Sequence, residues 1–316
     1  MIGENLGYEP LLDTSNAIFT QTPTHYIHDT LASYAVSYTD ARSGTHPSLP
    51  NYLRIFAGDD SDNNGVALDH DGCVCNPSGG NILDSCGNQI DCGMTKQVTE
   101  RNKATLYGRL KNDSDTTTDF VLYAEGLNDR GNKENFVCQN MDYTQKHNPA
   151  AYFTLPRTDE DGCTDGNGAV WKGFTQNSDP PPPANLFISG HRGVAFIIPG
   201  GDHNGHDGTT DVAKATAWND WLQNHLAHEG YIEYALNQSN KTLLIITQDE
   251  QQSTYGPNNH IMLFLISGDL SQGTTDGRNL EITAQYNILK TITQNFGVAA
   301  LGNTCTPTCS TYPPIL

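Results

Sequence analysis

The sequence predicts an α/β fold in which helices cover a mostly parallel sheet. Two observations lead to this prediction: short apolar runs rich in β-branched or aromatic residues, and helical candidates that lie between or beside them. Runs of this kind are typical of strands that are buried on both faces. Strands that alternate with helices usually form parallel sheets through crossover connections. The runs are Phe120–Ala124, Val194–Ile198, Leu243–Thr247 and Ile261–Ile266.

Three segments are predicted to be helices. The first has the clearest boundaries, because Ser48 is a good N-cap and Gly58 can close the helix. A proline in its first turn is also tolerated. The three helices are Leu49–Ala57, Asp211–His228 and Ala284–Asn295.

The length of the chain is compatible with one large α/β unit. At 316 residues, we expect a single domain over residues 1–316. Residues 58–93 have too few periodic apolar residues for an element of their own, and residues 157–183 end in a proline tract that can only be extended. Both segments are therefore interpreted as loop insertions.

Charge and hydropathy exclude two classes of function. The chain has 17 Lys and Arg against 36 Asp and Glu, a net charge of −19, which would repel a nucleic-acid backbone. The sequence also lacks the run of about eighteen apolar residues that a membrane span needs. Its first residues do not have the pattern of a signal peptide, so we expect a processed or partial chain.

The cysteines and the glycosylation motifs predict an extracellular protein. Eight cysteines are scattered through loops rich in Gly, Asn and Asp, which favours disulfides over buried thiols. Zinc is the competing interpretation for the close pairs, but their spacing is not that of zinc sites. Among many possible pairings we favour Cys138 with Cys163 and Cys305 with Cys309. The N-glycosylation motifs are at Asn112, Asn237 and Asn240.

Polar residues follow the predicted strands, at the positions where open α/β sheets bind ligands. Asp249 and Glu250 come directly after one apolar run, and adjacent acids there are costly unless a cation neutralises them. A glycine-rich loop with two histidines, His203 and His206, follows another run. The first pair predicts a divalent metal, and a solvated turn is the alternative. For the histidine loop, the alternative interpretation is a polar turn that binds no ligand.

Ser48 is the candidate nucleophile. A serine hydroxyl at a helix N-terminus faces free N–H groups and the positive end of the helix dipole. That environment suits a bound phosphate, or a nucleophile that must be partly ionised. A plain helix cap is the alternative interpretation.

The segment around Ser48, G-T-H-P-S-L-P-N-Y-L-R-I-F-A-G, resembles the nucleophile segment of a phosphoesterase family. This family includes secreted acid phosphatases and bacterial phospholipases C, and belongs to the alkaline-phosphatase-like superfamily. The short length resembles the acid-phosphatase branch. Further motifs occur in the same order along nearly the whole chain: E-N-L-G-Y-E at Glu4–Glu9, Y-A-E-G at Tyr123–Gly126, K-H-N-P at Lys146–Pro149, H-D-G-T at His206–Thr209, W-N-D-W-L at Trp218–Leu222 and T-Q-D-E at Thr247–Glu250.

The resemblance implies a three-layer α/β/α sandwich with an alkaline-phosphatase-like, mostly parallel central sheet. It also implies a secreted hydrolase of small phosphate esters that acts through a phosphoserine intermediate. An oxygen-rich metal site of this kind suits Mg²⁺, Mn²⁺ or Ca²⁺. The implied roles are nucleophile for Ser48, phosphate pocket for His147 and His206, and metal ligands for Glu4, Asn5, Asp249 and Glu250.

Three departures from the family pattern support a rival hypothesis. Asn204 stands where an aspartate is usual, and Gln285 replaces a histidine. In addition, only Met1–Gly3 precede the E-N motif, where the family has a central strand. The rival is a catalytically degenerate, extracellular structural subunit that assembles into homo-oligomers through strand exchange. The retained acidic residues and Ser48 favour the enzyme.

The strand position ahead of Glu4 is predicted to be filled. A buried parallel sheet cannot leave unpaired N–H and C=O groups at a central position. We expect Met1–Gly3 together with upstream residues, or a segment of another copy, to occupy it. The tail Thr311–Leu316 is a poor donor, because its two prolines cannot supply ladder hydrogen bonds.

A second cation site is suggested by the start of an EF-hand-like loop, D-S-D-N-N-G. No flanking helices are evident, so a solvated acidic loop is the favoured alternative. The residues that would hold calcium are Asp60, Asp62, Asn64 and Asp71.

Overall fold

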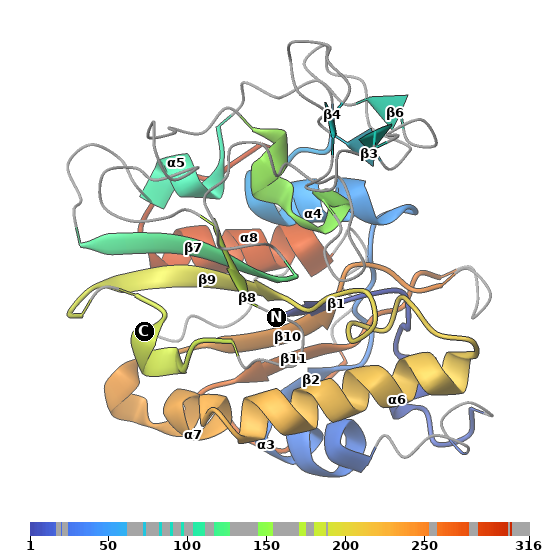
Figure 1. Ribbon diagram of the computed structural model, residues 1–316. Coiled ribbons are helices and arrows are strands. Elements are labelled where there is room, and N and C mark those ends of the chain that lie inside the picture. Colours follow the sequence, from blue (N-terminus) through green and yellow to red (C-terminus); the bar gives the residue numbers. More distant parts are fainter. Residues whose placement is uncertain are drawn as a thin grey trace.

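The computed structural model describes most of the chain, with gaps (Figure 1). The predicted insertions, residues 58–93 and 157–183, fall largely outside the described residues, and the single-domain boundary stays a prediction. Where they are described, the first contains three two-residue strands, and residues 171–174 of the second form a strand of the central sheet, which the sequence analysis did not predict. The described residues are 1–16, 20, 25–61, 72–73, 82–83, 89–90, 96–97, 104–110, 117–126, 145–153, 171–174, 180–187, 189–252, 258–277, 284–302 and 304.

The centre of the molecule is a mixed, mostly parallel sheet. One part has the strand order β1-β10-β11-β2-β12, in which β11 is antiparallel to both of its neighbours and the other pairings are parallel. The other part, β8-β7-β9, is entirely parallel, and β9 lies beside β1. The strands are β1 (Ile2–Gly3), β2 (Val36–Tyr38), β7 (Thr118–Glu125), β8 (Trp171–Phe174), β9 (Arg192–Ile198), β10 (Leu244–Gln248), β11 (Leu263–Ile266) and β12 (Thr274–Asp276).

Helices cover both faces of this sheet, as Figure 1 shows, so the predicted three-layer arrangement is confirmed. On one face lie α4 (Ser48–Ala57), α5 (Leu106–Leu110) and α8 (Ala284–Asn295). The other face carries α1 (Glu9–Leu12), η1 (Tyr26–Leu31), α3 (Ala32–Tyr34), α6 (Asp211–Trp221), η6 (Leu222–Ala227) and α7 (Tyr231–Leu236). Among the described helices, none is both long and apolar enough to span a bilayer.

Alternation along the strands divides the core into two clusters. In β7, every residue is buried, and Phe120 and Leu122 pack toward α4 while Val121 and Tyr123 pack toward α6. This is the two-sided burial that the apolar runs predict, and all four predicted strands are present. The predicted helix 211–228 is divided, because its last part, Leu222–Ala227, is a π-helix.

The remaining described elements are short. Two small strand pairs lie outside the central sheet, β3 with β6 and β4 with β5. Their bounds, and those of the single helical turns, are β3 (Gly72–Cys73), β4 (Ile82–Leu83), β5 (Gln89–Ile90), β6 (Lys96–Gln97), η3 (Gln145–His147), η4 (Pro149–Tyr152), η5 (Pro183–Asn185) and η7 (Gln238–Asn240).

The strand position ahead of Glu4 is occupied by the chain's own first residues. Ile2 and Gly3 pair in parallel with Thr247 and Gln248 of β10. The backbone N–H of Asp249 donates to the carbonyl of Gly3 over 3.0 Å, which continues the ladder to the sheet edge. The prediction that Met1–Gly3 fill this position is confirmed, and a contribution from other segments stays a prediction.

The first helix differs from the prediction at its start. Helix α4 begins at Ser48 itself, with Pro47 as the N-cap, and no side chain caps it. Ser48 is therefore not an N-cap, and its hydroxyl is available for other partners. The predicted end is confirmed, because Gly58 adopts a left-handed conformation with φ of 69° and donates to the Arg54 carbonyl.

We expect Gly58→Ala to destabilise the fold more than Gly297→Ala. Both glycines are left-handed, with φ of 69° and 66°. A Cβ at Gly58 would overlap the carbonyl oxygen of Leu301, whereas a Cβ at Gly297 meets no atom within 4 Å. Urea unfolding should show a loss of about 1 kcal/mol for Gly297→Ala, and about 2–4 kcal/mol for Gly58→Ala. Equal losses would contradict the packing of the α4 end against Leu301.

Candidate active site

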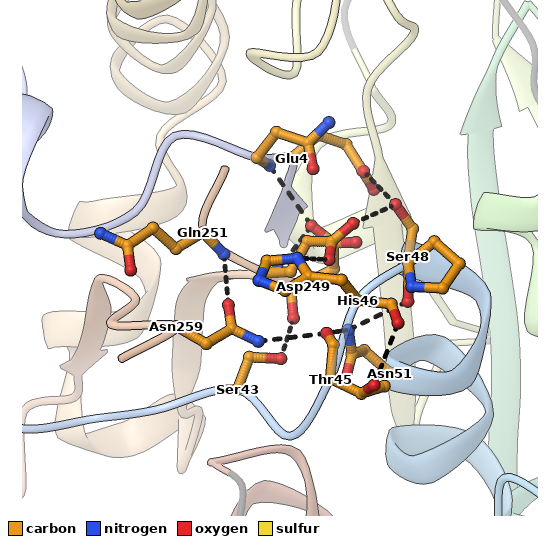
Figure 2. Close-up of polar contacts among 12 residues, drawn as sticks. Glu4, Ser43, Thr45, His46, Ser48, Asn51, Asp249, Gln251 and Asn259 are labelled. Atoms are coloured by element: carbon orange, nitrogen blue, oxygen red, sulfur yellow. Dashed lines mark hydrogen bonds and ion pairs between the residues drawn. The ribbon is translucent and has the colours of Figure 1, made fainter. Parts of the chain in front are cut away.

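Three acidic side chains converge on the hydroxyl of Ser48. Its Oγ lies 3.1 Å from Glu4 Oε2 and 3.0 Å from Glu250 Oε1, both within hydrogen-bond distance. Figure 2 shows Glu4, Asp249 and Ser48 facing one another from separate segments. Ser48, Glu4, Asp249 and Glu250 are all at most 4% exposed, so the carboxylates have lost nearly all of their contact with water.

The sheet brings these residues together. Because β1 and β10 are parallel neighbours, their carboxyl ends meet at one edge, which places Glu4 next to Asp249. Asn5 turns the chain away from the sheet with a left-handed φ of 55°. Its backbone N–H donates to Asp249 Oδ1 over 3.4 Å, and the N–H of Glu250 donates to the same oxygen over 2.7 Å.

Burial opposes the charge of these groups. It raises the pKa of the Glu4 carboxyl well above its ordinary range, and the neighbouring Asp249 raises this pKa further. Burial likewise raises the pKa of Asp249, and the neighbouring charge of Glu250 raises it further. The Oδ2 atom of Asp249 is buried and forms no hydrogen bond of standard geometry with any residue that the structure describes.

This donor set fits a hard cation. It consists of carboxylate oxygens, and one of them, Asp249 Oδ2, forms no hydrogen bond of standard geometry within the described part of the chain. In the described ranges, no three His, Cys, Asp or Glu side chains are already arranged around a common point as a metal site. The carboxylates instead surround the Ser48 hydroxyl.

One wall of the site is aromatic. His147, in η3, places Nε2 3.2 Å from Glu4 Oε2, without the geometry of a hydrogen bond. Its ring stacks on the ring of Tyr52, with 5.4 Å between the ring centroids, and its centroid lies 5.9 Å from that of the His206 ring. Burial lowers the pKa of His147 well below its ordinary range, which favours the neutral imidazole. The two histidines implied by the resemblance therefore lie next to each other, and His147 lies beside Glu4.

Asn204 has a structural role that an aspartate could not fill completely. Its Nδ2 donates to the carbonyl of Pro199 over 3.2 Å, and its Oδ1 accepts from the backbone N–H of His206 over 2.9 Å. Its own carbonyl accepts from the N–H of Glu4 over 2.7 Å. This buried residue joins the histidine loop to the E-N motif.

Gln285 also holds backbone in place. Its Nε2 donates to the carbonyl of Asp249 over 2.7 Å and to Ser43 Oγ over 3.0 Å. The Ser43 hydroxyl donates to the same Asp249 carbonyl through a short hydrogen bond. The first residues of α8 thus position the segment that carries Asp249 and Glu250.

Amide side chains connect the nucleophile segment to the acidic segment. Asn259 accepts from the N–H of Gln251 over 2.6 Å and donates to the carbonyl of Thr45 over 3.1 Å (Figure 2). Asn51, one turn into α4, donates to the same Thr45 carbonyl over 2.8 Å. These contacts fix the segment before Ser48 relative to the residues after β10.

Sequence reasoning missed two partners of the carboxylates. The Tyr52 hydroxyl donates to Glu4 Oε1, and His46 Nδ1 forms a short contact with Glu250 Oε2. Both residues belong to the H-P-S-L-P-N-Y segment that marks Ser48. Their position two residues before and four residues after the serine is the signal that could have identified them.

The other histidine of the glycine-rich loop has a different partner. His203 Nδ1 lies 2.8 Å from Glu125 Oε1, and Glu125 Oε2 accepts from the N–H of Gly200 over 2.8 Å. Glu125 ends β7 and is buried. This pair links the loop to the sheet.

The predicted calcium loop and the modification sites are described only in part. Asp60 Oδ2 accepts from Arg54 Nε and Nη2 at 2.9 and 2.5 Å. Asn237 is exposed, whereas Asn240 is partly buried and donates to the Tyr234 carbonyl. Asp62, Asn64, Asp71, Asn112 and every cysteine side chain lie outside the described residues, so the calcium site, glycosylation and disulfides stay predictions.

Comparison with known proteins identifies the family. The family model described as "Phosphoesterase family" matches residues 13–299. The chain belongs to this phosphoesterase family. It is 28% identical over 276 residues to the phosphatidylinositol-3-phosphatase of Mycobacterium tuberculosis, a match that covers 87% of this chain and 70% of the relative. It is 26% identical over 279 residues to a probable acid phosphatase of Kluyveromyces lactis, covering 86% of this chain and 54% of that protein.

Solved structures give weaker likenesses. A protein of the alkaline phosphatase superfamily from Vibrio parahaemolyticus matches with a TM-score of 0.47 at 13% identity, covering 95% of this chain and 66% of the other. A phosphonate monoester hydrolase from Silicibacter pomeroyi matches with a TM-score of 0.43 at 14% identity, covering 95% and 72%. Membership of the phosphoesterase family rests on the family match rather than on these structures.

With a chelator present, we expect the protein to lose stability as pH rises. The pKa values of Glu4 and Asp249 lie above their ordinary values of 4.5 and 3.8, so the folded state keeps protons that the unfolded state has released. The free energy of unfolding therefore decreases with pH above these ordinary values. Urea unfolding at about pH 5 and about pH 7 measures the decrease. The double variant Glu4→Gln, Asp249→Asn should have a flatter dependence, and equal slopes would contradict this assignment.

Proposed function

We propose that this protein hydrolyses small phosphate monoesters through a phosphoserine formed on Ser48. The observation that carries the proposal is the buried Ser48 hydroxyl, placed within hydrogen-bond distance of both Glu4 and Glu250. A hydroxyl becomes a nucleophile when an adjacent base takes its proton, and carboxylates can act as that base. The phosphatase names of two relatives that match most of this chain support the same reaction class.

In the proposed reaction, Ser48 Oγ attacks phosphorus in line with the ester oxygen. The hydroxyl proton passes to Glu4 or Glu250, and the bond between phosphorus and the ester oxygen breaks. The leaving oxygen takes a proton from His206, whose Nδ1 lies 2.6 Å from Asp207 Oδ1. Water then gives a proton to His206 as its oxygen attacks phosphorus; the bond between phosphorus and Ser48 Oγ breaks, Oγ takes back its proton from Glu4 or Glu250, and phosphate leaves. The low pKa of His147 suits it to accept or orient a hydrogen bond rather than to donate the proton.

A divalent cation, Mg²⁺, Mn²⁺ or Ca²⁺, is part of this proposal. Glu4, Asn5, Asp249 and Glu250 would hold it, since their oxygens suit a hard ion and Asp249 Oδ2 has no hydrogen-bond partner in the described structure. When bound, such an ion neutralises the buried carboxylates and lowers the pKa of a nearby hydroxyl.

The geometry favours an enzyme over the non-catalytic subunit. Asn204 and Gln285, the two substitutions behind the rival hypothesis, each form buried side-chain hydrogen bonds: Asn204 holds the backbone of Pro199 and His206, and Gln285 holds the carbonyl of Asp249. Neither substitution removes a group that contacts Ser48. Secretion and strand exchange between copies remain proposals that rest on the sequence.

Ser48→Ala should abolish hydrolysis of para-nitrophenyl phosphate while the protein still folds. Loss of a nucleophile reduces turnover by at least about a thousandfold. The matched control is Ser37→Ala, which removes a buried hydroxyl on β2, two strands away from β10. Wild-type activity should also disappear with a chelator and return with Mn²⁺. Turnover that persists in Ser48→Ala would exclude this serine as the nucleophile, and turnover that persists with the chelator would exclude the cation.

A further inference from the structure

The Glu4 carboxylate has two oxygens, and Ser48 uses only one of them. The other, Oε1, accepts a short hydrogen bond from the hydroxyl of Tyr52. Tyr52 is 1% exposed and Glu4 is fully buried, so water cannot replace this hydrogen bond. An unpaired carboxylate oxygen at this depth would be costly. The orientation of Glu4 is therefore coupled to Tyr52.

The spacing of Ser48 and Tyr52 makes this arrangement a property of helix α4. Residues four positions apart lie on the same face of a helix, one turn apart. Helix α4 consequently presents two hydroxyls to the two oxygens of a single carboxylate, Ser48 to Oε2 and Tyr52 to Oε1. Contacts at both oxygens restrict the rotation of this carboxylate away from the nucleophile, and the Tyr52 hydrogen bond remains when the Ser48 proton is directed to Glu250.

The Tyr52 side chain has two separate contacts at this site, and the first is the hydrogen bond from its hydroxyl to Glu4. The ring also stacks on His147, whose Nε2 lies 3.2 Å from the same Glu4 carboxylate. Tyr52 thus contacts Glu4 with its hydroxyl and supports with its ring the histidine beside Glu4.

A role in core packing alone does not account for the hydroxyl. The ring belongs to the core cluster between α4 and the sheet, where a phenylalanine would fill the same space. Phe56, one turn further along α4, packs in this cluster with no polar group. The feature that distinguishes Tyr52 from Phe56 is its hydrogen bond to Glu4.

We propose that Tyr52 is a positioning residue of the reaction, which fixes the Glu4 carboxylate so that its second oxygen faces Ser48. This inference rests on the proposed function and extends it to a residue that does not contact the substrate. The hydroxyl of Tyr52 acts through Glu4, which has two roles in the proposed reaction: it is a base for Ser48 and a ligand of the cation. By orienting this carboxylate, Tyr52 affects both roles. Residues that orient a metal ligand typically contribute about tenfold to a hundredfold to metal affinity or activity.

The test is Tyr52→Phe, compared with Tyr231→Phe. The control removes one buried tyrosine hydroxyl that donates to the Pro181 carbonyl, on the opposite face of the sheet. Circular dichroism and urea unfolding check that both variants fold. Calorimetry measures the Kd for Mn²⁺, and para-nitrophenyl phosphate gives kcat and KM. We expect Tyr52→Phe to lower kcat and weaken Mn²⁺ binding by about tenfold to a hundredfold each, with little change in KM. Tyr231→Phe should keep the wild-type values.

A double-mutant cycle with Glu4→Ala tests whether Tyr52 acts through Glu4. In the Glu4→Ala background, Tyr52→Phe should have no further effect on kcat or on Mn²⁺ binding. If the wild type is active and Tyr52→Phe is indistinguishable from Tyr231→Phe, the positioning role is overturned while the proposed function stands. Full additivity of Tyr52→Phe and Glu4→Ala would have the same consequence. A wild-type protein that neither hydrolyses the ester nor binds Mn²⁺ would instead overturn the proposed function, and the positioning role with it.

Discussion

The cost of burying three carboxylates around one hydroxyl governs the structure of this site. Glu4, Asp249 and Glu250 have almost no contact with water, and burial raises the pKa of the first two. Groups of like charge at this depth repel one another and favour protonation unless a cation or a donor compensates. The surrounding hydrogen bonds can be understood as the means by which the fold holds these groups together.

Lys146 and a set of neutral donors compensate these carboxylates, and the charge of Lys146 lowers the pKa of both Glu4 and Asp249. Asp249 Oδ1 accepts from two backbone N–H groups, and the Asp249 carbonyl accepts from Ser43 and Gln285. Glu4 accepts from Ser48 and Tyr52. None of these hydrogen-bond donors carries a positive charge. Lys146 offsets only part of the charge of three carboxylates, so a bound cation would compensate the rest, which is the basis of the proposed metal dependence.

Much of the fold and part of the site could be predicted from the sequence. The apolar runs identified four strands, because burial on both faces requires uninterrupted apolar residues. Strands β2 and β12 were missed, since each has three residues and β12 is largely exposed. Strand β8 was missed as well, because its four residues, W-K-G-F, contain a lysine and a glycine and lie in a segment predicted to be a loop. The positions of Ser48, Glu4 and Asp249 followed from motifs. Their supporting contacts did not, because a donor such as Gln285 is defined by the carbonyl that happens to lie beside it in space.

The two substitutions relative to the family pattern illustrate the same limit. From the sequence, Asn204 and Gln285 count as lost acidic and histidine ligands. In the structure both are buried amides that donate to backbone carbonyls, at Pro199 and Asp249 respectively. A carboxylate at 204 could not donate in this way. Sequence comparison detects that a residue has changed, whereas its function depends on the atoms around it.

The most direct test of the account is to look for phosphate on Ser48. The protein would be mixed with para-nitrophenyl phosphate, quenched in acid during turnover and digested with trypsin, which releases residues 43–54 as one peptide. Mass spectrometry with fragmentation then locates any phosphate among Ser43, Thr45, Ser48 and Tyr52. The account predicts phosphate on Ser48 during turnover and none without substrate. Continued hydrolysis with Ser48 unmodified, or phosphate on a different residue, would contradict it.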